Sequence, residues 1–299
     1  MNLRDLRYLV ALADTRHFGR AAEQCHVSQP TLSAQIKKLE DQLGVPLVER
    51  QPRNVTLTGP GAEVVERARR ILIEVDAMTE VAKLARDPLA GSLRLGLIPT
   101  LAPYLLPLVA PKLRKELPRL RLHLYEYQTA ELLRRLKDGD LDAAVLALGD
   151  DLGAFESRPL FDENFVVALP PGHRLATRNS LKPQDLDGET LLLLEDGHCL
   201  REQALAACGA SRAHEPQDFR ATSLETLRQM VGSGMGITLL PELATRGPFA
   251  SATNPVIRPF ARPQPGRRIG ILWRRSSARR AAVEAVADVL EKTGRHRTG

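Results

Sequence analysis

The first 58 residues constrain the fold most, because their apolar and turn residues predict three helices in close succession. Residues 3–13 carry apolar side chains at helical spacing, and a second short helix is predicted over residues 18–25. Ser28 is a favourable N-cap for a third helix that ends at Gly44. Two helices joined by a tight turn, the second with a polar face, predict a helix-turn-helix.

The polar face of the third predicted helix carries side chains that suit DNA. In this motif the N-terminal turn enters the major groove, where Gln, Ser and Thr bond base edges and phosphates while Lys neutralises phosphate charge. Two arginines flank a predicted two-stranded wing that runs to Thr58. The candidate DNA-contacting residues are Gln29, Pro30, Thr31, Ser33, Lys37, Arg50 and Arg53. A plain helical bundle with a solvated polar face is the alternative interpretation.

The net charge of +6 adds little to this interpretation. The excess of basic residues comes from residues 258–299, far from the predicted helix-turn-helix. Overall charge is therefore poor evidence for nucleic-acid binding here, and the helix pattern has to carry the prediction. We expect the arginine-rich end to be a solvated helix face and tail.

Several motifs in residues 1–61 occur together, in the order found in LysR-type transcriptional regulators. They are Phe18-x-x-Ala21-Ala22, Val27-Ser28-Gln29-Pro30-Thr31-Leu32-Ser33, Ile36-x-x-Leu39-Glu40, Leu43-Gly44, Leu47-x-x-Arg50 and Leu57-Thr58-x-x-Gly61. Several agreeing motifs are far more specific than one, so the chain resembles this family. The resemblance implies a winged helix-turn-helix that binds interrupted palindromic promoter sites in double-stranded DNA. It also implies a homo-oligomer, dimer or tetramer, that contacts RNA polymerase.

Residues 59–87 predict one long helix that follows the DNA-binding domain. Apolar residues recur at alternating spacings of four and three, which is the pattern of a coiled-coil seam. The helix would be roughly 43 Å long, which favours pairing with a second copy over packing on the chain's own regulatory domain. The seam consists of Val64, Ala68, Ile71, Val75, Met78, Ala82 and Ala85. Pro88 and Gly91 then break the helix, so residues 88–92 are expected to form a hinge.

From Leu93 onward, predicted strands and helices alternate, which indicates a parallel α/β sheet. Strands are predicted at 93–98, 120–125, 142–148, 236–240 and 269–273, and helices at 104–116, 129–138, 223–232 and 278–291.

The chain is expected to cross into a second α/β lobe at 159–171 and to return at 256–267. Two crossings resemble the periplasmic-binding-protein-like regulatory domain of LysR proteins. The expected fold is thus an α/β regulatory domain of two lobes, preceded by an all-α winged helix-turn-helix domain and a long linker helix. The expected division is 1–58 for DNA binding, 59–87 for the linker, 88–92 for the hinge, 93–161 with 268–299 for lobe I, and 162–267 for lobe II.

Two of the three cysteines, Cys199 and Cys208, lie in one short stretch. A buried strand is predicted at 190–194 and a helix from near Cys199. The helix N-terminus, His198 and Arg201 would each favour a thiolate at Cys199. Nine helical residues would separate the two cysteines by roughly 13 Å, whereas a disulfide needs Cα atoms within about 7 Å. Bonding would therefore require unwinding. Taken alone, both cysteines are also explained as small buried apolar residues.

Three segments around this stretch resemble the peroxide-sensing members of the LysR family: 96–100, 193–201 and 219–227. The resemblance implies that Cys199 reacts with hydrogen peroxide, that Cys208 then forms a disulfide with it, and that cellular dithiols reduce the disulfide. The implied supporting residues are Thr100, Thr129, His198 and Arg267, with Arg268 as the alternative to Arg267. Glu202 is a further candidate, because it stands where close relatives can carry Asp and would alter proton handling.

No metal-ligand spacing, phosphate loop or Ser/His/Asp triad is found in the sequence, so we expect no metal and no cofactor. No apolar run approaches the roughly 20 residues of a membrane span, and Met1–Leu12 does not read as an export signal. With only three cysteines, this predicts a cytoplasmic setting in which a disulfide would be a signal. We expect a regulator and not an enzyme. Two alternatives stay open: a LysR-type regulator that binds a small metabolite between its lobes, and a thiol peroxidase-like enzyme.

Overall fold

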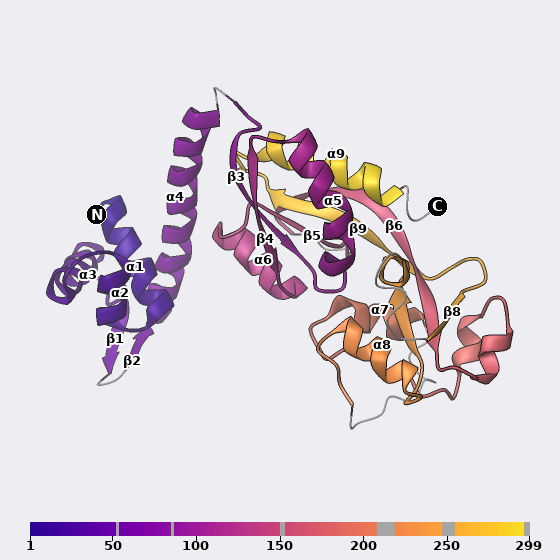
Figure 1. The fold of residues 1–299 in the computed structure, drawn as a ribbon. Helices are drawn as coiled ribbons and strands as arrows, with labels where there is room; N and C mark the ends of the chain where they lie inside the picture. Colours follow the sequence, from indigo (N-terminus) through magenta and orange to yellow (C-terminus); the bar gives the residue numbers. More distant parts are fainter. Residues whose placement is uncertain (52–53, 85–86, 150–152, 208–218, 247–254, 296–299) are drawn as a thin grey trace. The chain divides into compact units, whose positions relative to one another are not determined.

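The computed structural model describes residues 1–51, 54–84, 87–149, 153–207, 219–246 and 255–295 (Figure 1). The chain divides into two compact units, Met1–Arg86 and Asp87–Gly299, and each is considered by itself. Among the described residues, no helix combines the length and the apolar character needed to cross a membrane. Cys208 and Arg53 lie outside the described residues.

The first unit consists of the predicted helices and wing. Its elements are α1 (Leu3–Thr15), α2 (Phe18–Gln24), α3 (Gln29–Leu43), β1 (Val48–Gln51) and β2 (Asn54–Leu57), and the two strands pair antiparallel. Ser28 caps α3 as predicted, because its Oγ accepts the N–H of Thr31 at 3.3 Å. Gly44 ends α3 with a φ of 72°, a conformation that favours glycine. Leu9, Leu32 and Ile36 are fully buried between the helices.

The long linker helix is α4 (Gly59–Leu84), a single helix of 26 residues. Val65 and Ala68 are buried where its first turns pack against α1. Ile71 is 42% exposed and Met78 is 72% exposed. Of the predicted seam, Val64 and Ala68 are therefore covered within the chain's own first unit, whereas Ile71 and Met78 are uncovered. The side chain of Ala82 and the whole of Ala85 lie outside the described residues.

The second unit is built on a seven-stranded sheet with the order β4-β3-β5-β9-β6-β7, and β8 pairs with β6 off this path. The strands are β3 (Gly91–Leu97), β4 (Leu120–Glu126), β5 (Ala143–Ala147), β6 (Phe155–Leu169), β7 (Thr238–Pro241), β8 (Val256–Pro259) and β9 (Gly266–Arg274). Strand β3 pairs parallel with β4 and β5, as predicted. Strand β9 runs antiparallel to β5 and β6, and β7 and β8 run antiparallel to β6.

The sheet is therefore mixed, and the expectation of a parallel sheet is wrong beyond β3, β4 and β5. The reason lies in the return of the chain. After the segments that pair with the end of β6, the chain comes back as β9 and enters between β5 and β6 in the opposite direction. The order of strands and helices along the sequence does not show where β9 enters the sheet or in which direction it runs.

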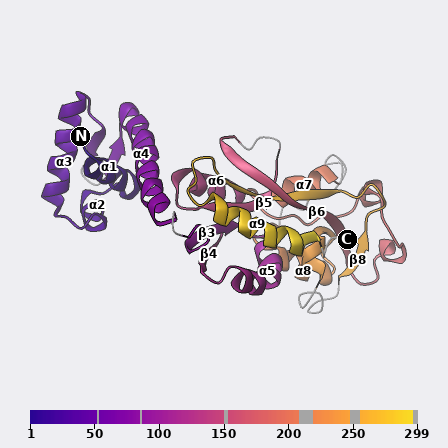
Figure 2. The same cartoon turned by 90° about the horizontal axis from the view of Figure 1, so that it is seen from above.

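Strand β6 is shared by two parts of the second unit. Phe155–Asn164 pairs with β9, and Phe165–Leu169 pairs with β7 and β8. In both views β6 runs as one long pink strand from the neighbourhood of β5 to that of β8 (Figures 1 and 2). The two parts of the unit are thus joined through β6 and β9.

The helices of the second unit are α5 (Ala102–Glu116), α6 (Thr129–Asp138), α7 (Cys199–Ala207), α8 (Leu224–Gly232) and α9 (Arg280–Arg295). Single-turn 3-10 helices are η1 (Arg174–Thr177), η2 (Pro183–Leu186) and η3 (Glu242–Thr245). Helices α5 and α9 pack on each other, and α6 packs on β5 and β9.

The segment 190–194 is not the strand that its apolar run predicts. Leu191–Leu194 are buried, but they form only isolated bridges, from Leu191 to Ile237 and from Leu194 to Ala221. An apolar run predicts burial but not strand pairing. Here each of the two partner segments forms a β-bridge with the run at a single position, so no strand results.

Candidate functional site

Five of the seven residues predicted to contact DNA lie along α3. Gln29, Pro30, Thr31 and Lys37 are exposed, and Ser33 is half-buried. The hydroxyl oxygens of Ser28 and Thr31 are 2.7 Å apart, which fixes the first turn of the helix. Arg50 belongs to β1, but its side chain, like the whole of Arg53, lies outside the described residues.

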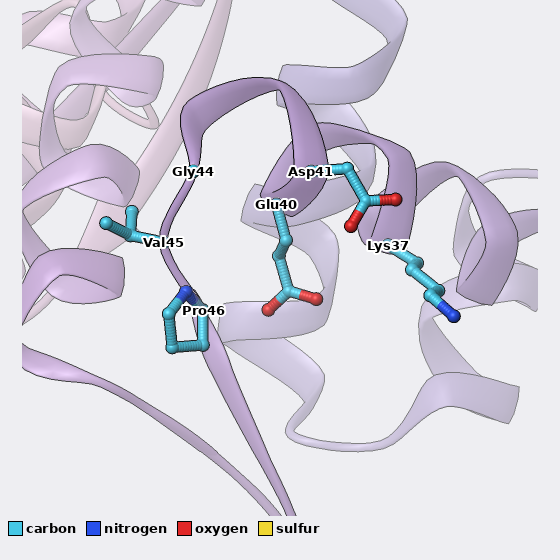
Figure 3. Close-up of a pocket in the computed structure, with 6 residues that line it drawn as sticks. All are labelled: Lys37, Glu40, Asp41, Gly44, Val45 and Pro46. Carbon is cyan, nitrogen blue, oxygen red and sulfur yellow. The ribbon is translucent and has the colours of Figure 1, made fainter.

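A hollow lies at the end of α3, where the chain leaves this helix and continues toward the wing (Figure 3). Glu40 extends there toward the chain at Pro46, whereas Lys37 and Asp41 extend from α3 on the other side. The Glu40 Oε1 atom accepts the N–H of Leu47 at 2.7 Å and that of Val48 at 3.1 Å. Glu40 therefore fixes the start of β1 on α3, and the hollow has a structural explanation.

Replacing Ser33 with Trp is expected to abolish site-specific DNA binding, because a half-buried position on the face predicted to enter the major groove has no room for an indole. Affinity for a promoter site should fall to the non-specific level, a loss of about 10³-fold or more. Fluorescence anisotropy at fixed salt measures the loss, and circular dichroism checks that the fold is kept. Undiminished affinity would exclude α3 as the helix that reads the sequence.

Cys199 is the first residue of α7, as predicted, and packs half-buried against the core of the second unit. Among the described residues Cys199 and Cys25 are free thiols. Arg201 Nε pairs with Asp196 at 2.9 Å, and Arg201 Nη1 donates to the carbonyl oxygen of Leu194 at 3.3 Å. Arg201 is therefore paired with Asp196 and with the backbone of the preceding segment, while Cys199 occupies the N-terminus of α7.

The turn before Cys199 lies against the N-terminus of α6. Gly197 has a φ of 96°, a conformation that favours glycine, and a Cβ there would be 2.6 Å from the Gln128 Oε1 atom. Gln128 is the N-cap residue of α6, and Thr129 follows it. The Thr129 Oγ1 atom is buried and makes no hydrogen bond to any described residue. The fold thus brings Thr129 to the helix end on which the cysteine turn packs.

A cavity of about 310 Å³ lies beside the same turn. Thr100, which is 2% exposed, and His198, which is 6% exposed, line it from separate segments of the chain. Tyr104 and Glu225 also line it. Burial and the nearby Glu225 carboxylate raise the pKa of Tyr104 to about 12 despite the opposing effect of Arg228, so the phenol keeps its proton.

The two arginines that the sequence left as alternatives differ sharply in their surroundings. Arg267 is buried, and its guanidinium contacts Thr100 and Glu163. Arg268 is exposed and pairs with Asp162 at 2.8 Å on the surface. Of the two, only Arg267 touches a residue that lines the cavity. Glu202 is exposed in the first turn of α7 and is not among the described residues that line the cavity.

Burial lowers the pKa of His198, and the carboxylate of Glu195 opposes this only partly. The imidazole is therefore neutral near pH 7 in the folded protein. The folded pKa lies below the unfolded value of about 6.5, so the stability that this group contributes is present above that value. This stability is lost as the pH falls from about 6.5 through the folded pKa, because the unfolded chain then binds the proton more readily.

We therefore expect the free energy of unfolding to decrease as the pH falls below about 6.5, and His198→Gln to weaken this dependence. Urea unfolding of both proteins between pH 7.5 and pH 5 measures the effect. His173→Gln is the comparison, because this imidazole is half-buried, lies 3.2 Å from the Glu189 carboxylate and does not line the cavity. Identical pH dependence in the original protein and the His198 variant would contradict the prediction.

Comparison with known proteins identifies the family to which both units belong. Residues 3–62 match the model of the bacterial regulatory helix-turn-helix protein, lysR family, and residues 86–295 match the LysR substrate binding domain. The chain belongs to the LysR family. Its first unit is therefore a DNA-binding helix-turn-helix domain, and its second is the family's α/β regulatory domain. The resemblance seen in the sequence is confirmed, and the chain is a transcription regulator and not a peroxidase enzyme.

Within the LysR family, the chain is similar to OxyR proteins. The DNA-binding transcriptional dual regulator OxyR of Escherichia coli K12 is 49% identical over 290 residues, 97% of this chain and 95% of that protein. A full-length OxyR variant from Pseudomonas aeruginosa is 40% identical with a TM-score of 0.79, covering 99% of this chain and 97% of that one. A hydrogen-peroxide-bound OxyR cysteine variant from Corynebacterium glutamicum is 35% identical with a TM-score of 0.67, covering 99% and 94%.

Proposed function

We propose that this chain is a hydrogen-peroxide-responsive transcription regulator that controls oxidative-stress genes through a reversible disulfide between Cys199 and Cys208. The observation that carries the proposal is the free thiol of Cys199 at the start of α7, directly after His198, which lines a cavity with Thr100. The OxyR relatives, one of them bound to hydrogen peroxide, support it.

The proposed chemistry begins at the thiolate of Cys199. Its sulfur attacks one peroxide oxygen, the O–O bond breaks, and the leaving oxygen takes up a proton to depart as water. Cys199 is then a sulfenic acid, and the thiol of Cys208 condenses with it to form the disulfide and a second water. Cellular dithiols in the cytoplasm reduce the disulfide by exchange. The role of Cys208, which lies outside the described residues, rests on the resemblance to peroxide-sensing relatives.

Hydrogen-bond donors from the segments around the cysteine turn are proposed to assist the departure of the leaving oxygen. The hydroxyls of Thr100 and Thr129 and the imidazole of His198 are the proposed groups, and Arg267 acts on Thr100. Because burial lowers the pKa of His198, its imidazole contributes hydrogen bonds without a permanent charge.

The remaining proposals concern the assembled regulator. We propose that residues 1–58 bind interrupted palindromes, that residues 59–87 pair subunits into a dimer or tetramer, and that residues 88–92 form the hinge. Lobe I would comprise 93–161 with 268–299, and lobe II 162–267, joined through β6 and β9. RNA polymerase is the proposed partner at the promoter.

Exposed apolar residues on α4 support the pairing of subunits. Replacing Ile71 and Met78 together with Asp is expected to give monomers and to lose tight binding to paired half-sites, because charges cannot be buried in an apolar seam. Sedimentation velocity gives the mass. Arg67→Asp is the matched control, because it adds a carboxylate at an exposed position of α4 outside the seam. An unchanged mass for the Ile71 and Met78 variant would place association elsewhere.

A DNA footprint of the reduced and the peroxide-treated protein tests the proposed function. The footprint is expected to change on oxidation and to return with dithiothreitol, whereas Cys199→Ser should give one footprint under all conditions. If peroxide leaves the footprint unchanged and a small metabolite changes it in the Cys199→Ser variant as well, the chain is a metabolite-responsive LysR regulator instead.

A further inference from the structure

We propose that Glu163 is a positioning residue of the peroxide site, which acts through Arg267 to hold the hydroxyl of Thr100 as a hydrogen-bond donor. The inference rests on the proposed function, because it names a residue that serves the reaction of Cys199. Glu163 belongs to β6 and Arg267 to β9, 104 residues apart in the sequence.

Both carboxylate oxygens of Glu163 are engaged. Its Oε2 atom accepts from Arg267 Nε at 2.8 Å, and its Oε1 atom accepts the N–H of Leu243 at 3.1 Å. The side chain of Glu163 is 0% exposed and that of Arg267 is 1% exposed. A buried carboxylate with two donors has one stable orientation, so Glu163 is a fixed anchor for the guanidinium.

The other two nitrogens of the Arg267 guanidinium donate hydrogen bonds to Thr100. Arg267 Nη1 donates to Thr100 Oγ1 at 2.8 Å, and Nη2 donates to the carbonyl oxygen of Thr100 at 3.1 Å. A guanidinium has donors only, so the Thr100 hydroxyl must accept this bond. Its own hydrogen is then left for a different acceptor. Because Thr100 lines the cavity with His198, peroxide oxygen there can receive this hydrogen bond.

Glu163 lies at the point in the sheet where β6 changes its pairing partners, so its hydrogen bonds link Arg267 to both parts of the second unit. Glu163 pairs with Arg267 in the ladder just before β6 leaves β9 and begins to pair with β7 and β8. Its bond to Leu243 reaches η3, which follows β7. Glu163 thus connects Thr100, through Arg267, to both parts of the second unit. Without the carboxylate, the guanidinium would lose its anchor at Nε and its counter-charge.

The neighbouring pair offers a matched control on the same two strands. Asp162 and Arg268 also pair in the ladder of β6 and β9, and their ion pair is likewise 2.8 Å long. Their side chains are 71% and 62% exposed. Asp162→Asn therefore removes an equivalent bond between the same strands without touching Thr100.

The test uses the full-length chain carrying Cys25→Ser and Cys208→Ser, so that Cys199 is its one thiol. Oxidation by hydrogen peroxide and alkylation by iodoacetamide are followed as second-order rate constants. Both reactions need the thiolate, but only peroxide cleavage benefits from a donor to the leaving oxygen. Glu163→Gln is expected to slow oxidation at least about tenfold and to change alkylation less than about threefold. Asp162→Asn should change neither rate.

Two further variants make the result decisive. Thr100→Val should reproduce the selective loss of oxidation, and adding Glu163→Gln to it should cause little further loss, since both act through one hydroxyl. If Glu163→Gln does not fold, Glu163→Asp replaces it in the same comparison of single and double variants. This change keeps the carboxylate charge but shortens the side chain by one methylene group. An unchanged oxidation rate, or an equal fall in oxidation and alkylation, would overturn the inference. If the chain without changes at residues 163 and 100 reacts with peroxide no faster than free cysteine, the proposed function fails instead.

Discussion

Cys199→Ser is expected to make the protein blind to hydrogen peroxide, whereas Cys208→Ser should still react and then stop at sulfenic acid or overoxidise. The first change removes the sulfur that is proposed to attack peroxide, and the second removes only the thiol that would trap the product. Intact mass after treatment with peroxide and dimedone distinguishes the products, because dimedone adds only to the sulfenic acid. A complete loss of reaction is expected for Cys199→Ser.

Cys25→Ser is the control for these two variants. Burial raises the pKa of the Cys25 thiol, so this cysteine stays protonated and a poor nucleophile. It also lies in the first unit, next to the turn between α2 and α3. The Cys25 variant should therefore react with peroxide as the unchanged protein does. Equal peroxide reactivity of the Cys199 and Cys208 variants would contradict the assignment of the attacking thiol.

The first unit could be predicted closely because its signals are local. Ser28 and Gly44 stand next to the ends of α3 that they fix, and each acts through the backbone a few residues away. The predicted helix at 129–138 coincides with α6 for the same kind of reason, since Gly139 ends it in a left-handed conformation. By contrast, the insertion of β9 between β5 and β6 depends on how the chain returns after β8, which no local pattern encodes.

The site could be predicted only in part because its contacts span long distances in the sequence. Arg267 and Thr100 are 167 residues apart, and Arg267 and Glu163 are 104 residues apart. Adjacent residues on a strand point to opposite faces, so Arg267 and Arg268 have opposite environments that depend on the register with β6. Glu163 could not have been found in this way, and neither could the close approach of Gln128 to Gly197.

Disulfide formation is expected to unwind α7 instead of adjusting it slightly. From Cys199 to Ala207, the last described residue before Cys208, the helix spans roughly 12 Å. The two cysteine Cα atoms must come within about 7 Å to bond. Leu200 and Ala204 are each 2% exposed, so unwinding would pull them out of the core. Removing a side chain such as Leu200 from the core costs about 1.5–3 kcal/mol, which keeps the oxidised state strained and reducible.

Hydrogen exchange of the reduced and oxidised protein tests this refolding directly. Backbone amides of α7 are expected to lose protection on oxidation, and the change should extend through residues 195–225, because the turn before Cys199 bonds to Ala221 through Glu195. Amides of β3 and β5 serve as the internal reference, and Cys208→Ser treated with peroxide controls for oxidation without a disulfide. Released apolar residues would change the surface available to a second subunit, and through it the spacing of paired DNA-binding domains. Matching protection in both states, with the disulfide confirmed by mass, would leave no role for refolding, and the signal would then have to pass through small shifts around Thr100 and Arg267.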